Sequence, residues 1–205
     1  RMEIKKLHGL LLDANEYVVC SDKECLLIDC GARLDDVIMA TGGKKVVGIL
    51  LTHGHYDHSL NCLEQAKHFD CKIYANENIK ETLVDPEASY SEDGTIIDDF
   101  SRFEFIEGDK KIKVGDFDID CYYCPGHSNC CECYMIDGLL FAGDVLFENG
   151  VGRTDLKSSS REKMYNSLCK LEKIKFDKVY SGHGNASDYD FQMKNISIFK
   201  RFLSR

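Results

Sequence analysis

The stretch that decides the fold is Thr52-His53-Gly54-His55-Tyr56-Asp57-His58, which follows the apolar run Val46–Leu51. Such an apolar run is typical of a short buried strand, so the polar stretch begins where that strand ends. An extended chain would scatter these side chains to opposite faces, so we expect a tight turn at Gly54 to gather them. Imidazoles and a carboxylate suit zinc, iron, manganese or nickel, and a thiol-free cluster on a loop indicates a catalytic metal site. The alternative is a polar turn that is rich in histidine by chance.

Length and charge limit the classes of protein that this chain can represent. Its 205 residues are enough for a full hydrophobic core, and we expect residues 1–205 to form one domain. The net charge of −9 disfavours a nucleic-acid partner, because phosphate binding needs clustered Lys and Arg. No charged-then-apolar leader is present, and no apolar run approaches the ~18 residues of a membrane span. We therefore expect a cytoplasmic protein that acts on a small molecule and has no membrane partner.

Strand and helix patterns alternate in the first half of the chain, which predicts an α/β fold. There we expect strands at residues 4–7, 17–20, 26–28, 46–51 and 71–75 and helices at residues 34–40, 60–68 and 77–83. In the second half we expect a meander of strands at residues 103–105, 111–114 and 117–124, a hairpin at 134–142 and a strand at 179–180. A capping box at Ser159 and Glu162 predicts one helix, and a closing amphipathic helix presents Phe191, Ile198 and Phe202.

Residues 85–102 differ from their surroundings, because six acids crowd around Pro86 and Gly94 with few apolar anchors. One interpretation is a solvated acidic loop. The other is a loop that overhangs the metal-rich turn and helps to select a substrate.

Potential metal ligands recur at the ends of apolar strands, each time beside a glycine. They are His53, His55, Asp57, His58, His127, Asp144 and His183. One sheet edge can bring such strand ends together, and this set is too large for one tetrahedral site but fits two metals that share a carboxylate. The other two histidines, His8 and His68, lack this context and are expected to be ordinary surface or core residues.

In order along the chain, these residues stand in His53-x-His55-x-Asp57-His58, Pro125-Gly126-His127-Ser128, Gly143-Asp144 and Ser181-Gly182-His183-Gly184. This ordered set resembles the metallo-β-lactamase superfamily over nearly the whole chain. The resemblance implies a four-layer αββα sandwich with the site at one edge of two packed sheets. It also implies that His53, His55 and His127 hold a first metal, that Asp57, His58 and His183 hold a second, and that Asp144 bridges them.

The segment Leu146–Leu156 looks like one found in small glyoxalase II-like hydrolases and in persulfide dioxygenases. Resemblance to the glyoxalase II-like branch implies hydrolysis of a small thioester or ester, including lactones, by a hydroxide that bridges two metal ions. Zinc is the expected metal, with iron or manganese as alternatives, and Asp57 would also orient the hydroxide. The same second-site pattern disfavours a lactamase proper. We expect Arg153 and Asp155 to form a structural ion pair that supports the Asp144 loop.

Two other functions remain open at this point. A persulfide dioxygenase would hold one iron on His53, His127 and Asp144, which this sequence also contains, so ligand identity cannot separate the two enzymes. The third candidate is a metal-binding or sensing protein that does no chemistry.

Eleven cysteines are many for a chain without an export signal. In a reducing compartment we expect them to be thiols, most of them buried as small hydrophobic side chains. Two C-x-x-C pairs, Cys121/Cys124 and Cys130/Cys133, stand closer together than the pairs of structural zinc sites. We therefore expect these four to be packing thiols, with a redox or accessory metal role as the alternative.

Overall fold

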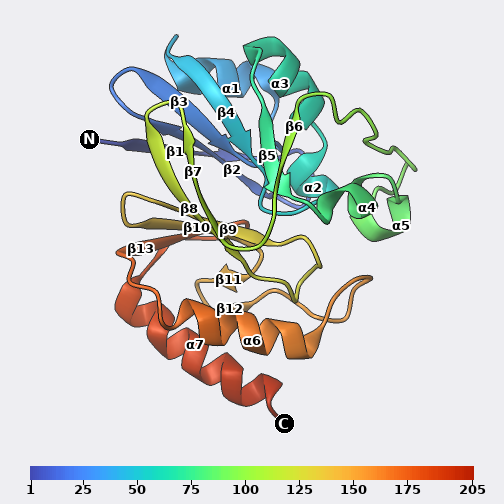
Figure 1. The fold of residues 1–205 in the computed structure, drawn as a ribbon, viewed down its shortest axis with the longest axis vertical. Helices are drawn as coiled ribbons and strands as arrows, with labels where there is room; N and C mark the ends of the chain where they lie inside the picture. Colours follow the sequence, from blue (N-terminus) through green and yellow to red (C-terminus); the bar gives the residue numbers. More distant parts are fainter.

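Two six-stranded sheets stack face to face in the computed structural model, which describes residues 1–205 (Figure 1). Helices cover the outer face of each sheet, so the layers follow the αββα order that the sequence predicts. The structure thus confirms the α/β fold class.

The first sheet is built from the first half of the chain. Its strands lie in the order β1 (Glu3–His8), β2 (Asn15–Cys20), β3 (Glu24–Ile28), β4 (Lys45–Leu50), β5 (Ile73–Asn76) and β6 (Phe103–Ile106). The pairs from β1 to β3 are antiparallel, whereas those from β3 to β6 are parallel. We expected β6 to begin the second-half meander, and this is wrong: the chain crosses over between β5 and β6, which makes the two strands parallel neighbours.

The second sheet is built from the second half of the chain and has the order β14-β13-β10-β9-β8-β7. Its strands are β7 (Lys110–Val114), β8 (Phe117–Tyr123), β9 (Glu132–Ile136), β10 (Leu139–Gly143), β13 (Lys178–Ser181) and β14 (Ser187–Asp188). The predicted hairpin is confirmed, since β9 and β10 pair antiparallel around Asp137-Gly138. A small ribbon, β11 (Leu146–Phe147) and β12 (Gly150–Val151), follows β10.

The helices fall into two groups, one on each outer face. On the side of the first sheet lie α1 (Leu34–Thr41), α2 (Tyr56–Ser59), α3 (Cys62–Phe69), α4 (Ile79–Leu83) and α5 (Pro86–Ser89). On the side of the second lie α6 (Arg161–Leu171) and α7 (Tyr189–Leu203). The helix expected over residues 60–68 corresponds to α3, and the short helix α2 precedes it within the histidine-rich turn. No helix combines the length and the apolar character needed to cross a bilayer.

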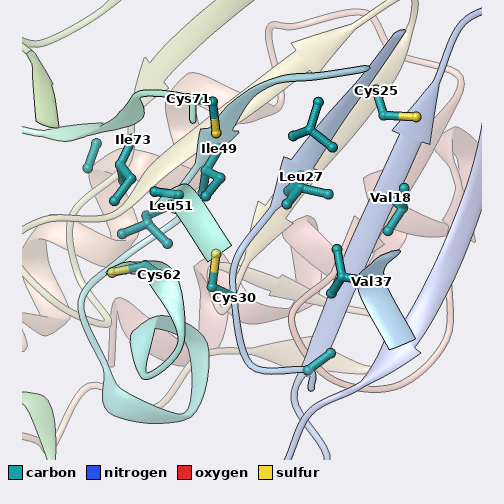
Figure 2. Close-up of a cluster of buried hydrophobic side chains, with 14 of the residues drawn as sticks. Val18, Cys25, Leu27, Cys30, Val37, Ile49, Leu51, Cys62, Cys71 and Ile73 are labelled. Carbon is teal, nitrogen blue, oxygen red and sulfur yellow. The ribbon is translucent and has the colours of Figure 1, made fainter. Parts of the chain in front are cut away.

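The core consists of three layers of buried side chains. Because side chains alternate along a strand, Val18 of β2 packs under the helices of the first sheet while Val19 faces the second sheet. Figure 2 shows the first of these layers, which fills the space between the first sheet and its helices. The third layer lies under α6, whose predicted face of Met164, Leu168 and Leu171 is buried there.

Two details of the helices differ from the sequence prediction. The N-cap of α6 is Ser160, which accepts a hydrogen bond from Lys163 N, whereas the expected cap Ser159 donates its hydroxyl to the carbonyl of His127. On α7, Phe191, Ile198 and Phe202 are exposed, and the helix packs through a neighbouring apolar face, on which Ile196 and Leu203 are buried and Tyr189, Met193 and Phe199 contact the core. Gln192 and Asn195 are buried beside this face, where both donate to the carbonyl of Phe147.

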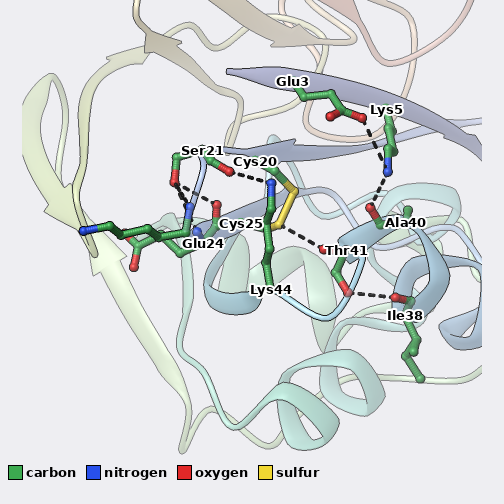
Figure 3. The surroundings of a disulfide bond; sticks show 11 residues. Glu3, Lys5, Cys20, Ser21, Glu24, Cys25, Ile38, Ala40, Thr41 and Lys44 are labelled. Atoms are coloured by element: carbon green, nitrogen blue, oxygen red, sulfur yellow. Dashed lines mark hydrogen bonds and ion pairs between the residues drawn. A yellow bond between two sulfur atoms is a disulfide. The ribbon is translucent and has the colours of Figure 1, made fainter. Parts of the chain in front are cut away.

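One pair of cysteines is oxidised, which corrects the expectation of thiols throughout. Cys20 ends β2 and lies directly opposite Cys25 of β3, and the two form a disulfide (Figure 3). The antiparallel register places them as partners, which sequence spacing alone did not reveal. The other nine cysteines are free.

Candidate metal centre

The predicted ligands converge at one edge of the two stacked sheets. The turn that carries His53 to His58 follows β4, Asp144 follows β10, and His183 follows β13. His127 lies in the connection between β8 and β9. Strand ends that are far apart in sequence therefore meet, as the spacing predicted, because both sheets end at this edge. The remaining histidines lie apart from the centre: His8 is exposed and bonds Asp13, and His68 packs on Phe69.

The seven side chains fall into two groups that could each hold a metal ion. Within each group, one ligand atom of every member lies within 4.8 Å of those of the others. The first group is His53, His55 and His127, and the second is Asp57, His58, Asp144 and His183.

In the first group, one ring nitrogen of each imidazole faces the centre of the group. In His53 and His127, the other ring nitrogen contacts a protein oxygen on the outer side. His127 Nε2 lies 3.1 Å from His55 Nδ1, and the whole group is buried. On the outer side, His127 Nδ1 donates to the carbonyl of Arg153 at 2.9 Å. His53 Nδ1 lies 3.0 Å from the hydroxyl of Thr52. Such outer contacts orient the rings and leave the inner nitrogens to a cation.

The second group places a carboxylate between two imidazoles. His58 Nε2 lies 3.2 Å from His183 Nε2, and Asp57 Oδ2 lies 3.2 Å from the same His183 nitrogen. The outer nitrogen of His58, Nδ1, bonds Asp29 Oδ2 at 2.9 Å. His58 is fully buried, whereas the His183 side chain is 30% exposed, so the second group lies nearer to solvent.

Asp144 stands between the two groups. Its Oδ2 lies 3.7 Å from His53 Nε2 and 3.5 Å from His127 Nε2, which belong to the first group. The same oxygen lies 3.5 Å from His183 Nε2, and Oδ1 lies 3.2 Å from His58 Nε2, which belong to the second. This carboxylate can therefore reach a cation in either group.

The chemistry of the donor set fits divalent cations. Burial alone would raise the pKa of Asp144, but His58, His127 and His183 surround it and hold that pKa well below its usual value. Burial, followed by the neighbouring His58, lowers the pKa of His53 well below its usual value. His53 Nε2 and Asp144 Oδ1 are buried without a hydrogen-bond partner, which is costly unless a cation engages them. The residues present therefore suit a metal.

Asp29 is a supporting residue that the sequence analysis did not single out. It ends β3 in a left-handed conformation with φ of 64°, and its carboxylate accepts from Thr52 N and Thr52 Oγ1, each at 2.7 Å. Through His58 Nδ1 it also orients a member of the second group. It shares the context of the predicted ligands, an acidic residue after an apolar strand and near a glycine, and that signal could have revealed it.

The support expected from Arg153 and Asp155 takes a different form. Their side chains bind each other bidentately, at 2.6 and 2.8 Å, and both are about two-thirds exposed. An exposed pair of this kind contributes little to stability, so it does not brace the Asp144 loop as predicted. The contact that matters is the main-chain carbonyl of Arg153, which fixes His127.

The acidic segment overhangs the centre through one aromatic side chain. Tyr90 lies after α5, and its ring meets His55 edge-on at a centroid distance of 5.5 Å. Its hydroxyl accepts a hydrogen bond from Lys157 N at 2.9 Å, which ties this segment to the loop beyond Arg153. Tyr90 thus overhangs the centre, as in the second interpretation, while five of the six acids of residues 85–102 are exposed to solvent, as in the first.

The cysteines near His127 are buried thiols, as expected. Cys130 and Cys131 lie 3.3 and 3.1 Å from the hydroxyl of Ser128, and burial raises the pKa of both thiols. Neither belongs to the two ligand groups. A neutral thiol is a poor ligand and a poor nucleophile, which favours a packing role.

Replacing Cys130 and Cys133 together by alanine should leave the metal content of the purified protein unchanged. The expected cost is about 1 kcal/mol of stability for each buried sulfur removed. Elemental analysis and thermal unfolding of the double variant measure both quantities. Loss of one metal equivalent per chain would instead assign these thiols to the centre.

Comparison with known proteins agrees with this site. Residues 10–183 match the sequence profile of the Metallo-beta-lactamase superfamily. The probable metallo-hydrolase YqgX of Bacillus subtilis is 32% identical over 187 residues, which cover 86% of this chain and 88% of that protein. The crystal structure of the BLEG-1 B3 metallo-beta-lactamase is similar with a TM-score of 0.84 and 25% identity, covering 99% of this chain and 100% of that one.

A second solved structure, that of TTHA1623 in a di-iron-bound form, shares the fold with a TM-score of 0.76 and 22% identity. The structural match covers 93% of this chain and 96% of the TTHA1623 chain. The family profile matches most of the chain, and YqgX is 32% identical over most of both proteins. This chain belongs to the metallo-beta-lactamase superfamily.

Proposed function

We propose that this chain is a hydrolase of small thioesters or esters, including lactones, and that it is similar in function to the glyoxalase II-like enzymes. We propose that it uses two divalent metal ions, with zinc as the expected metal. The observation that carries the proposal is the position of Asp144, whose carboxylate lies within 3.7 Å of nitrogen atoms from both ligand groups. A carboxylate shared between two sites is typical of binuclear hydrolytic centres.

In the proposed centre, His53, His55 and His127 would hold the first metal, and Asp57, His58 and His183 would hold the second. Asp144, which lies close to nitrogens of both groups, would serve both. The outer hydrogen bonds to Thr52, Arg153 O and Asp29 support this division, because each fixes the ring of a proposed ligand.

When bound, two such cations polarise a substrate carbonyl and lower the pKa of a water from about 15.7 toward ~7. The chain contributes the position of the reacting groups. Asp57 accepts a hydrogen bond from the attacking water and orients it toward the carbonyl carbon. The water oxygen forms a bond to the carbonyl carbon, and the C–S or C–O bond to the leaving group breaks. The acyl group leaves as a carboxylic acid, and the proton released by the water ends on the departing thiol or alcohol. No serine or cysteine nucleophile takes part.

Metal content and oxygen uptake, measured together, test this proposal. About two zinc ions per chain, hydrolysis of a simple acyl thioester and no oxygen uptake on glutathione persulfide are the expected results. One iron per chain with oxygen uptake on the persulfide would replace the proposal by a persulfide dioxygenase, which His53, His127 and Asp144 would also serve. Bound metal with neither reaction would favour a binding protein.

The Asp57→Asn variant should keep the first metal and bind the second more weakly, because it removes a ligand charge and leaves the three histidines of the first group untouched. Hydrolysis should fall by more than the roughly 10–100-fold that follows loss of an outer-shell partner. Metal titration followed by elemental analysis gives the stoichiometry. Equal loss of both metals, or unchanged turnover, would contradict this division of ligands.

A further inference from the structure

A groove opens directly beside the second ligand group. It has a volume of about 490 Å³, within the usual range of roughly 300–1,000 Å³ for small-molecule sites. Most of its wall is apolar: the loop after β1 supplies three leucines, α2 and the residue after it supply Tyr56 and Leu60, and Tyr90 after α5 also lines it. Asp57 lines the same groove, so a molecule bound there lies next to the proposed reacting centre.

The leucine loop holds apolar side chains out of the core. Leu12 is 82% exposed and has a left-handed backbone with φ of 53°, which a leucine rarely adopts. Hydrogen bonds from Gly9 N to Ala14 O and from Leu10 N to Gly31 O keep the loop in this shape. Strained residues and exposed apolar patches are enriched at binding sites, and here both occur on one wall of the groove.

The charged side chains that line the groove are all acidic. Besides Asp57, which belongs to the second ligand group and whose charge a bound metal would offset, they are Glu92 and Asp93, and no lysine or arginine lines the groove. Hydrogen bonds from Thr95 N and the Ser91 hydroxyl to Asp93 lower the pKa of that carboxyl, so it carries its charge at neutral pH.

Two cations stand near Tyr90, but each already has a carboxylate partner. Arg153 is held bidentately by Asp155, and Lys157 lies 2.7 Å from Asp85. A ligand carboxylate next to Glu92 and Asp93 would therefore meet negative charge and no lysine or arginine of the groove wall, since Arg33 lies beyond Leu10 in a neighbouring pocket. This is a repulsive basis for specificity.

We propose that this groove binds the acyl part of the substrate, an uncharged aliphatic group. The protein would thereby select apolar acyl groups over acyl groups that end in a carboxylate. This inference rests on the proposed hydrolytic function of the adjoining centre. Leu10, Leu11 and Leu12 form the apolar contact surface, and Glu92 and Asp93 reject anionic ends.

Three thioesters with the same neutral leaving group, N-acetylcysteamine, test the selection on the metal-loaded protein. The hexanoyl thioester should be turned over with a kcat/KM at least about 10-fold above that of the acetyl thioester, because apolar contact discriminates at this level. The adipoyl thioester, equally long but ending in a carboxylate, should fall at least about 10-fold below the hexanoyl compound. Equal values for hexanoyl and adipoyl would overturn the inference while leaving the hydrolase intact.

Variants connect the selection to the groove. The Leu10→Ser/Leu11→Ser double variant should reduce the hexanoyl-to-acetyl ratio, and Asp93→Lys should raise the adipoyl-to-hexanoyl ratio. Met39→Ser is the matched control, because Met39 is as exposed as Leu12 but lies on α1 away from the groove. It should leave both ratios unchanged. Ratios that do not respond to the groove variants would contradict the assignment.

Binding of non-hydrolysable analogues separates this inference from the proposed function. Ketones in which a methylene replaces the thioester sulfur can be titrated by calorimetry, and the hexanoyl analogue should bind at least about 10-fold more tightly than the adipoyl analogue. That result without hydrolysis of any thioester would refute the hydrolase but support the groove. Absence of binding, or equal binding of both analogues, would refute the groove.

Discussion

The Asp144→Asn variant will lose hydrolysis and will bind at least one metal equivalent less per chain than the wild-type protein. The side chain keeps its size, but the charge that lies between the two ligand groups is gone. Asparagine can offer one neutral oxygen to one cation, so neither group retains a shared anionic ligand. We expect turnover to fall well beyond the roughly 10–100-fold typical of outer-shell losses.

Two further variants serve as comparisons for Asp144→Asn. Asp29→Asn changes a carboxylate that hydrogen-bonds the outer nitrogen of His58, so we expect metal affinity to fall by roughly 10–100-fold. Asp155→Asn changes an exposed carboxylate that pairs with Arg153, and it should leave metal content unchanged. Asp144→Asn protein that keeps two metals and its activity would remove the basis of the proposed binuclear centre.

The convergence of the candidate ligands could be predicted because they follow the ends of apolar strands. His53, Asp144 and His183 lie far apart in sequence, yet the alternation of strands and turns is enough to bring them to one sheet edge. The α/β class followed from the alternation of strands and helices, whereas the αββα order of layers came from the family resemblance that the ordered motifs carry.

Features that depend on particular contacts and registers in the folded chain could not be predicted in the same way. The role of Asp29 depends on Thr52 and His58, which the fold brings to it across 23 and 29 residues. The Cys20–Cys25 disulfide depends on the register of one strand pair. Sequence spacing gives the residue types but not these registers and contacts.

The buried face of α7 does follow hydrophobic periodicity, but through other residues than those predicted. Tyr189, Met193, Ile196, Phe199 and Leu203 recur at helical spacing and pack into the core under α6, whereas Phe191, Ile198 and Phe202 are exposed. Gln192 and Asn195 lie beside that stripe and donate to the carbonyls of Phe147 and Gly150 in the β11–β12 ribbon. A window of sequence does not show these hydrogen bonds, because their acceptors lie far away along the chain.

The Gly182→Ala variant should disable the centre without changing any proposed ligand. A β-carbon at this position would overlap Asp144 Oδ1 and lie 2.7 Å from His58 Cε1. Both side chains are buried, so one of them must move away from its ligand position. We expect metal affinity to fall by at least the roughly 10–100-fold of an outer-shell change, together with about 1–3 kcal/mol of stability from overpacking.

The Gly48→Ala variant separates these two effects. A β-carbon there would lie 2.7 Å from Val114 Cγ1 and 3.2 Å from Tyr74 Cε2, a comparable crowding of side chains that are not members of either ligand group. It should lower the thermal stability to a similar degree but leave metal stoichiometry and affinity as in the wild type. Metal titration and thermal unfolding of both variants make the comparison. If Gly182→Ala loses only stability, as Gly48→Ala should, then the close approach of residue 182 to Asp144 and His58 does not hold the centre in place.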